Sequence, residues 1–430
     1  MCIQSHAQSA SEPVNLRMLD AGPYSILERS DWRRYDNGRY VGLVRNEVRA
    51  SIITHTAEGN YGNSTFHDST FYHGNFFVFQ STLRDMRQSA QAVDAIIPVS
   101  FEVMSDGSIE IEDDKGFPMM RGFPSFPDKG VTQGVKWYAQ GNRAVDPLNT
   151  GQAIVIPFIA EYEYRGTEYY TGIPVHRIHA LYGYNYKNEV TPHPYTHVRG
   201  THKVDILIRA EDGLPIFMRD ELTKAYTLAG GSVTEFRGFT LTFGSGIVPM
   251  NKSLVLESLE KTLKIETPVV IAPPPEVITG PATTGPSEAE DQARRPPPPI
   301  DTAGLQNSAI DLTPVPEGIK LTIKDIRFMP DSADFLVSER PRLDLLAEAL
   351  KQIPNRTFLV EGHTASTGRP AGEMQLSVER AKSIIDELVR RGISADRFIY
   401  KGWGGTKPIG DNGTDVGRSA NRRVEITILE

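Results

Sequence analysis

The residues best suited to binding chemistry lie in the stretch GHTASTGRPAGEMQLSVERA, at 362–381. It follows an apolar, strand-like segment, passes through a loop of small residues and enters an amphipathic pattern for which Ser377 is the predicted helix N-cap. Arg380 then falls in the predicted first turn, where its guanidinium and the unbonded helix amides both favour an anion. A carboxylate on the facing wall would complete a clamp for a zwitterion.

The acidic half of such a clamp is less directly encoded. Thr364 and Ala365 come immediately after the strand, and the first acidic residue beyond them is Glu373. Two glycines and a proline lie between, so the loop does not fix where this carboxylate points. Glu373 either supplies the negative charge, or forms an ion pair with Arg380, or is a solvated loop side chain, which is the prediction we favour.

The surrounding segments predict alternating strands and helices. Residues 318–328 alternate as a strand, a helix capped by Ser338 follows with Pro341 in its first turn, and RTFLVEGHT is a second strand. The helix after Ser377 ends at Gly392, and DRFIYKGWG and RRVEITIL supply two more strands. The order β-α-β-α-β-β predicts an α/β sandwich with its helices on one face of a mixed sheet. The core-facing stripes are Leu343, Leu346, Ala347, Leu350 and Ile353 in the first helix, and Ala381, Ile384, Ile385 and Leu388 in the second.

Residues 38–262 carry the pattern of a β-rich region. Stretches such as AIVIPFIAEYEYRGTEYY are rich in β-branched and aromatic residues, and turn pairs such as Asp106-Gly107 separate them. We expect a β-sandwich or an open curved sheet, in one or two domains that divide near residue 150. The alternation would also suit strands that cross an outer membrane, but charged residues interrupt the faces that lipid requires to be apolar. One helix is predicted within this region, from the spacing of Leu83, Met86, Ala90, Val93 and Ile97.

Composition marks the domain boundaries in a chain of 430 residues. Residues 263–305 combine proline runs with small and charged residues, which cannot bury enough apolar surface to fold. They predict an extended linker between the β-rich region and a C-terminal domain at 306–430. Residues 1–37 are predicted to be an N-terminal extension.

Charge and cysteine content exclude several classes of protein. The net charge of -8 gives no electrostatic basis for binding nucleic acid. The single cysteine, Cys2, rules out an internal disulfide. A lipid on Cys2 after removal of a signal would anchor the N-terminus to a membrane, and an ordinary unstructured N-terminus is the alternative.

The sequence contains neither a recognisable catalytic motif nor a convincing set of metal ligands. The sequence holds no nucleophile elbow, Walker loop, zinc-protease motif or dinucleotide-binding glycine pattern after a strand, so we expect no enzyme activity and no cofactor. The best metal candidates are histidines in a strand-like context, where Pro194 argues against a shared helix face, and we predict no metal site. These histidines are His176, His179, His193, His197 and His202.

The segment from 318 to 430 resembles the OmpA-like C-terminal domain, the peptidoglycan-associating module of many envelope proteins. The resemblance rests on VEGHT, LSVERA and GWGGTKPIGDNGTDVGRSANRRVEI, and it covers roughly a quarter of the chain. The β-rich region and the order of the parts loosely resemble spirochaetal, especially treponemal, envelope proteins that end in this domain. The resemblance therefore implies the periplasm or an outer-membrane-associated position in the cell envelope.

The resemblance also implies a ligand. In the family, an aspartate directly after GHT and the arginine of LSxxRA contact the zwitterionic end of diaminopimelate in the peptidoglycan stem peptide. Here Arg380 keeps the arginine, Ala365 replaces the aspartate, and Glu373 stands where an asparagine is usual. The loss of a partner for a desolvated ammonium costs roughly 1 to 3 kcal/mol, so we expect binding to be weakened, changed or lost. Asn421, Arg422 and Arg423 are predicted to be framework residues of the same signature.

The sequence thus predicts a multidomain, non-enzymatic structural protein of the cell envelope. Its expected partners are the peptidoglycan stem peptide, through an altered site, and other envelope proteins. Two alternatives stay open: a protein-interaction scaffold without cell-wall binding, and a β-rich domain that carries a ligand or an enzymatic activity.

Overall fold

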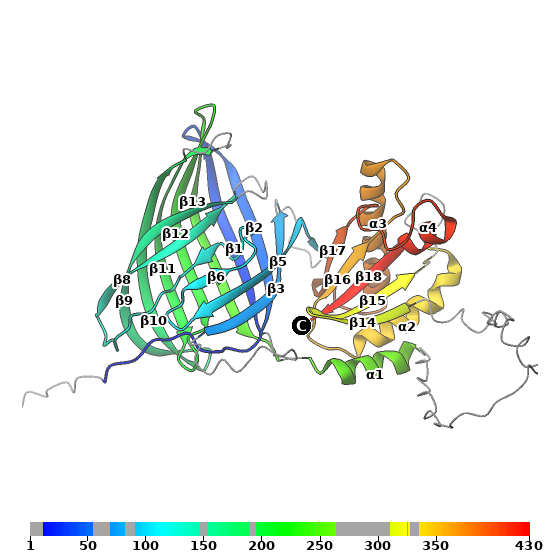
Figure 1. Ribbon diagram of the computed structural model, residues 1–430, viewed down its shortest axis with the longest axis horizontal. Coiled ribbons are helices and arrows are strands. Elements are labelled where there is room, and N and C mark those ends of the chain that lie inside the picture. The colour runs from blue at the N-terminus through cyan, green and yellow to red at the C-terminus, as the bar shows by residue number, and fades with distance from the viewer. Residues whose placement is uncertain are drawn as a thin grey trace, which may run out of the picture. The chain divides into compact units, whose positions relative to one another are not determined.

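The computed structural model describes residues 12–54, 69–81, 91–146, 153–188, 195–248, 250–263, 310–324, 326 and 335–430 (Figure 1). By its internal contacts the chain divides into two units. The first comprises residues 1–250 with 316–318 and 429–430, and the second comprises residues 251–315 with 319–428. Residues 1–11 with Cys2, and most of the predicted linker, lie outside the described residues.

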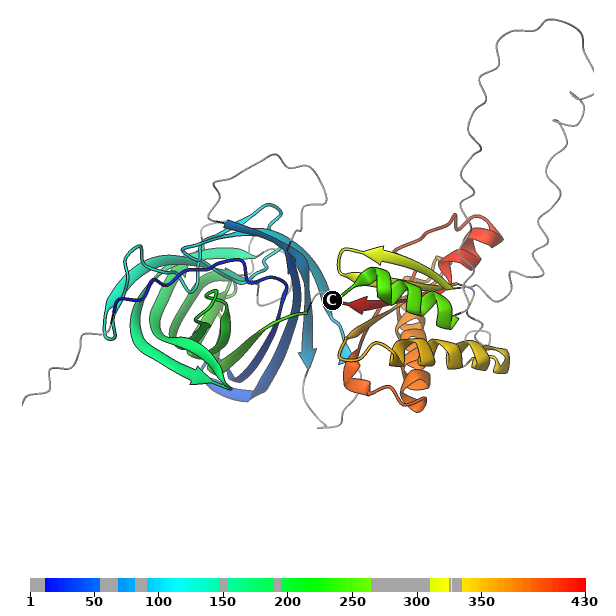
Figure 2. The ribbon, with the colours of Figure 1, turned by 90° about the horizontal axis from the view of Figure 1, so that it is seen from below.

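A single twelve-stranded sheet forms the first unit, and every neighbouring pair of strands in it is antiparallel. The strand order is β6-β5-β3-β2-β1-β13-β12-β11-β10-β9-β8-β7, so β6 and β7 are the edges. Figure 2 shows how the sheet curls around its interior. The strands are β1 (Tyr24–Asp36), β2 (Arg39–Thr54), β3 (Ser69–Ser81), β5 (Ala95–Met104), β6 (Ile109–Ile111), β7 (Met120–Arg121), β8 (Lys136–Val145), β9 (Ile154–Tyr170), β10 (Ile173–Lys187), β11 (Tyr195–Arg209), β12 (Pro215–Leu228) and β13 (Val233–Gly246). A short strand, β4 (Gln91–Ala92), lies outside this sheet.

The period-two alternation decides which side chains fill the curled sheet. Along β9, Ile156, Phe158 and Tyr162 are buried, whereas Ile159 between them is exposed. Successive side chains of a strand point to opposite faces, so each strand contributes one apolar row to the interior. The resulting core contains many aromatic side chains, among them the stacked pair Phe158 and Tyr182.

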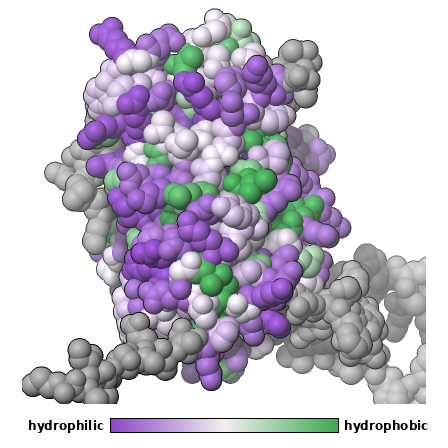
Figure 3. All heavy atoms as spheres, turned by 90° about the vertical axis from the view of Figure 1, so that its left-hand side faces the viewer, coloured by the Kyte–Doolittle hydropathy of each residue, from purple (hydrophilic) through white to green (hydrophobic). Residues whose placement is uncertain are grey.

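The outer face of the sheet carries charges that pair between neighbouring strands. Examples are Lys136 with Glu161 at 2.7 Å and Arg177 with Asp205 at 2.9 Å. Figure 3 shows polar side chains over much of this face, with smaller apolar patches between them. No helix in the described part of the chain is long and apolar enough to cross a membrane.

The β-rich region is confirmed, and of the two predicted architectures the open curved sheet is the one that the chain adopts. Several boundaries differ from the prediction. Strand β1 starts inside the predicted extension of residues 1–37, because its residues pair with both β2 and β13. Strands β8 and β9 flank residue 150 yet pair with each other, so the sheet does not divide there. The prediction of a helix over residues 83–97 is wrong for the second half of that stretch.

That half forms strands because the sheet provides partners for it. Ile96 and Ile97 pair with β3 as part of β5, while Leu83, Met86 and Ala90 lie outside the described residues. The periodicity of the stretch fits a helix, but hydrogen bonding to β3 overrides this local preference.

The second unit is built on a mixed sheet, as the sequence predicted. Its strands run in the order β14-β15-β18-β16-β17, with β16 parallel to β17 and antiparallel to β18. They are β14 (Ile310–Val315), β15 (Gly318–Lys324), β16 (Phe358–Gly362), β17 (Phe398–Gly402) and β18 (Arg423–Leu429). The α/β class of this unit is thereby confirmed, with β14 as a strand that the sequence analysis did not identify.

The helices of this unit bury the predicted apolar stripes. All five predicted residues of α2 or its C-terminal end, and all four of α3, are buried. Ser338 does not cap α2: it lies in the short 3-10 helix η2, and Glu339 is the N-cap residue, without a side-chain hydrogen bond. Helix α1, which fell at the end of the predicted β-rich region, packs against α2. The helices are α1 (Lys252–Leu263), η2 (Val337–Glu339), α2 (Arg340–Lys351), α3 (Pro370–Arg390), η3 (Ala395–Arg397) and α4 (Asp415–Asn421).

Candidate ligand-binding site in the second unit

The candidate site lies where the end of β16, helix α3 and the loop after β17 meet. Helix α3 begins at Pro370 rather than at Ser377. Proline suits the first turn because its fixed φ fits a helix and its missing N–H is not needed there. The predicted helix start is therefore wrong by seven residues, and this moves two site residues from the first turn into the helix interior.

Ser377 is fully buried and joins two elements. Its hydroxyl donates to the Met374 carbonyl at 2.7 Å and accepts from the Gly404 N–H at 2.9 Å. The helix and the strands approach so closely here that a Cβ on Gly362 would collide with the Ser377 carbonyl, and one on Gly402 would collide with the Ser377 hydroxyl. Ser377 thus fixes the loop after β17 against α3 instead of capping the helix.

Glu373 is not the solvated loop residue that the sequence favoured. It is buried, and its Oε1 accepts from the Thr367 hydroxyl at 3.0 Å and from the Arg369 N–H at 3.1 Å, as well as from the Thr367 N–H. The N–H of Thr367, followed by that of Arg369, holds the pKa of Glu373 below its usual range against the opposing effect of burial. The carboxylate therefore organises the loop and the helix N-terminus, as the acidic member of a capping box does.

Thr364 and Ala365 lie in the loop that follows β16. The Thr364 N–H donates to the Gly404 carbonyl at 2.9 Å, and the next loop residue, Ser366, donates its N–H to the Asn412 side chain at 3.0 Å. Both Thr364 and Ala365 are buried, and the Thr364 hydroxyl has no hydrogen-bond partner among the described residues. Position 365 is thus held by backbone hydrogen bonds on both sides, and its alanine carries no charge.

Arg380 lies in the middle of α3 and is half-buried. Its guanidinium is therefore not combined with the amides of the first turn, as the predicted helix start implied. The ion pair between Arg380 and Glu373 is not among the contacts of Glu373, whose described hydrogen bonds go to the loop. Arg380 and the Thr364–Ala365 segment are the two parts of the predicted site, and their joint role stays a prediction.

The predicted framework residues differ in their environments. Asn421 is fully buried, and its amide bonds to the N–H groups of Ile409 and Gly410, to the Gly410 carbonyl and to Asn412. It fixes the loop whose Asn412 also holds Ser366. Arg422 is exposed at the C-terminal end of α4. Arg423 is buried, pairs with Glu425 at 2.6 Å and donates to the Lys407 carbonyl.

A buried charged cluster next to the site was missed by the sequence analysis. The register places Glu361 of β16 opposite Glu425 of β18, and Trp403 Nε1 donates to Glu361 at 2.7 Å. Burial raises the pKa of Glu361. Burial also acts to raise the pKa of Glu425, but Lys320 and Arg423 outweigh it and lower that pKa to about 2. Period-two alternation in FLVEGHT and RRVEI contained this signal, because it puts the charged residues of each strand on one face.

The histidine candidates do not assemble. His202 Nδ1 lies 2.7 Å from Asp220 and His179 faces Asp205. His176 contacts Tyr164 and His197 contacts Asn185, so each of these four candidates has a separate environment. Across the described ranges, no three metal-ligating side chains form a group. His193 lies outside the described residues.

Comparison with known proteins gives one family and several relatives that each match part of the chain. The OmpA family model matches residues 327–422. The chain is 37% identical over 103 residues to the peptidoglycan-binding protein ArfA of Mycobacterium tuberculosis. The aligned region covers 24% of this chain and 32% of that protein. The chain is 36% identical over 105 residues to outer membrane porin F of Pseudomonas aeruginosa, covering 24% of this chain and 30% of that protein. The chain thus spans about a third of the length of these curated relatives.

A solved structure matches a similar share of this chain, but over nearly the whole of its own length. An outer membrane protein from Borrelia burgdorferi B31 is 33% identical, and the match covers 28% of this chain and 98% of that one with a TM-score of 0.25.

Proposed function

Because residues 327–422 are an OmpA-family domain, we propose that this chain is a non-enzymatic protein of the cell envelope whose C-terminal domain associates with peptidoglycan. The position is the periplasm or the periplasmic side of the outer membrane. The names of the relatives, a peptidoglycan-binding protein and an outer membrane porin, support this proposal.

The observation that carries the proposal is that the loop with Thr364 and Ala365 is tied to α3, through Gly404 to Ser377 and through Thr367 to Glu373. It is held by Gly404 on one side and by Asn412 on the other, and the same α3 carries Arg380. Arg380 supplies a guanidinium for the carboxylate of a zwitterionic stem-peptide residue. Ala365 supplies no charge for the ammonium, so we propose that the affinity for diaminopimelate is weakened or that another stem-peptide residue is preferred.

Glu373 does not replace the missing aspartate in this proposal. Its Oε1 is committed to three donors in the loop, and turning it toward a ligand would break those hydrogen bonds. The ammonium of a diaminopimelate ligand therefore meets solvent instead of a carboxylate. Loss of that charge is what distinguishes this site from the family pattern.

Co-sedimentation of the full chain with purified sacculi tests the proposal. Sacculi whose stem peptides contain diaminopimelate, lysine or ornithine are compared, since each presents a different side-chain end. We expect binding to at least one type, with loss in Arg380→Ala and no loss in the control Arg390→Ala. Arg390 lies on the same helix with a side chain 68% exposed, so it controls for the removal of a positive charge.

The alternative is a protein-interaction scaffold without cell-wall binding. It follows if the wild-type chain sediments with none of the three types of sacculi. A second outcome is that Arg390→Ala reduces binding as much as Arg380→Ala. The first outcome contradicts association with peptidoglycan, and the second contradicts the site.

A further inference from the structure

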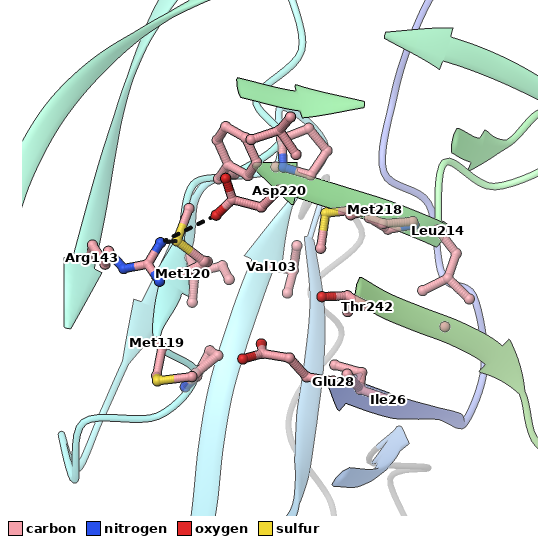
Figure 4. Close-up of a pocket in the computed structure, with 18 of the residues that line it drawn as sticks. Ile26, Glu28, Val103, Met119, Met120, Arg143, Leu214, Met218, Asp220 and Thr242 are labelled. Atoms are coloured by element: carbon pink, nitrogen blue, oxygen red, sulfur yellow. Dashed lines mark hydrogen bonds and ion pairs between the residues drawn. The ribbon is translucent and has the colours of Figure 1, made fainter. Parts of the chain in front are cut away.

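The curled sheet of the first unit encloses a cavity of about 170 Å³ that lies far in sequence from the candidate peptidoglycan site. Its lining comes from nearly every strand of the sheet and from the segment around β7 (Figure 4). Most of the wall is apolar, with Ile26, Val103 and Leu214 beside the methionines Met119 and Met218. Methionine side chains adapt to the shape of a bound molecule, because they are unbranched and polarisable.

Charged residues from three strands gather at one part of this wall. Glu28 of β1 lies opposite Thr242 of β13, and two residues further along Asp220 of β12 lies opposite Thr240 of β13. Arg143 of β8 faces them: its Nη1 lies 3.9 Å from Asp220 and donates to the Tyr182 hydroxyl at 2.8 Å. Figure 4 shows the carboxylates of Glu28 and Asp220 directed into the same space.

The carboxylates offer more acceptors than the protein satisfies. Among the described residues the Glu28 carboxylate has no hydrogen-bond donor. Asp220 Oδ1 is buried and likewise has no partner in that part of the chain. The other Asp220 oxygen lies 2.7 Å from His202 Nδ1. An ionised carboxylate only accepts hydrogen bonds, so a ligand at this part of the wall has to donate them. An anionic ligand would face two carboxylates that share one nearby guanidinium.

The electrostatics of the surrounding groups agree with a cationic ligand. Burial raises the pKa of Glu28, although Arg143 and Lys224 oppose it. Burial, together with Arg143, lowers the pKa of Lys224 to about 7, and burial lowers that of His202 to about 4. His202 is thus neutral near pH 7 and Lys224 is only partly charged. An added positive charge at Glu28 would relieve the cost of its burial.

We propose that this cavity binds a small apolar molecule carrying one primary ammonium group. The ammonium lies at the part of the cavity that Glu28 and Asp220 line and donates to the Glu28 carboxylate, while the apolar part packs against Ile26, Val103 and Met218. A cavity of about 150 Å³ accommodates benzene, so a ligand with one ring or a short chain fits this volume. The site would make the first unit a ligand carrier, independent of peptidoglycan.

Three probe molecules of nearly equal shape but different charge test the proposal on the full wild-type chain. The probes are 2-phenylethylamine, 2-phenylethanol and phenylacetate, measured by isothermal calorimetry at pH 7. We expect the amine to bind with one-to-one stoichiometry, the alcohol to bind at least about tenfold more weakly, and phenylacetate to show no binding. The comparison needs no variant, so it stays decisive if a variant fails to fold.

Two variants locate the site. Glu28→Gln keeps the shape but removes the charge, so the amine should lose at least about tenfold in affinity while the alcohol changes by less than about threefold. Val103→Phe fills the cavity and should abolish binding of both. The control is Glu221→Gln, since Glu221 is the neighbour of Asp220 on β12 with a side chain 63% exposed.

Three results overturn the proposal: no binding of any probe to the wild type, equal affinity for amine and alcohol, or unchanged amine affinity in a folded Glu28→Gln variant. Loss of affinity in Glu221→Gln equal to that in Glu28→Gln would likewise show that the effect is not local to the cavity.

Discussion

The hydroxyl of Ser377, inside α3, accepts a hydrogen bond from the backbone N–H of Gly404 at 2.9 Å. It also donates to the carbonyl one turn earlier in the helix, at Met374. One buried oxygen therefore joins the helix to the loop after β17, and that loop in turn accepts the Thr364 N–H.

Ser377→Ala should destabilise the second unit by about 1 to 3 kcal/mol, because it leaves the Gly404 N–H without its acceptor. Hydrogen exchange of the full chain, followed on peptides from 358–362 and 398–404, measures the effect locally. Ser394→Ala is the control, since Ser394 is exposed and makes no side-chain cap bond. Equal exchange in the two variants would contradict the role of Ser377.

Gly402→Ala should destabilise the same unit by about 1 to 3 kcal/mol, because the new methyl group would overlap Val378 and the Ser377 hydroxyl. Gly372→Ala is the matched comparison within α3. Nothing lies within 4 Å of a Cβ there, so alanine should stabilise the helix by roughly 0.5 to 1 kcal/mol. The same exchange measurement should give opposite signs for the two variants, and equal signs would refute the close packing at Gly402.

Glu373→Ala should loosen the loop before α3 and destabilise the unit by about 1 to 3 kcal/mol, because it removes the acceptor of the Thr367 and Arg369 N–H groups. Limited proteolysis of the full chain should then cut within 366–369. Glu379→Ala controls for charge, since Glu379 is exposed on the same helix. A solvated Glu373, as the sequence suggested, would instead leave the cleavage pattern unchanged.

The second unit should lose stability as the pH falls from about 6.5 to 5. Burial, and next Arg423, lower the pKa of His363 to about 3 from a usual value of 6.5. In that window the unfolded chain takes up a proton that the folded chain does not, so stability declines by at most about 1.4 kcal/mol per pH unit. The stability that Glu425 contributes is lost only below about 4.5, so the two effects separate.

His363→Leu removes the titrating group. The ring nitrogens of His363 have no hydrogen-bond partner among the described residues, so leucine should fold normally at pH 7.5. Hydrogen exchange of peptides from 423–429, corrected for the intrinsic effect of pH on exchange, measures the stability of the unit. Between pH 6.5 and 5 this stability should decline less in the variant than in the wild type. If stability declined as much as in the wild type, a titrating group other than His363 would be the cause.

Ala365→Asp should raise the affinity for diaminopimelate-containing fragments at least about tenfold, because the new carboxylate would face the ligand ammonium while Arg380 holds its carboxylate. Calorimetry of the full chain measures this, with Ala365→Asn as a control of similar size without charge. Arg380→Ala in the Ala365→Asp background should remove the gain. Glu373 stays in place in these variants, because its loop contacts are structural. An equal gain in Ala365→Asn would show that charge is not the cause.

The sequence by itself determined the class of both units and the core of the second one. Local apolar spacing was sufficient for the stripes of α2 and α3, since a helix buries the face that its own periodicity defines. Alternation was likewise sufficient to predict a β-rich region, because each strand needs only one apolar row to face a core.

Tertiary structure decided where α3 begins, what Glu373 does and which strands are neighbours. Ser377 has the residue type of an N-cap, but close packing against Gly402 and Gly404 makes it a helix-interior contact. The pairing of Glu361 with Glu425, and the meeting of Glu28, Asp220 and Arg143, depend on register between strands far apart in the chain. Alternation tells which residues of a strand share a face, but not which distant strand lies beside it, because that is decided by hydrogen bonding and packing between whole strands.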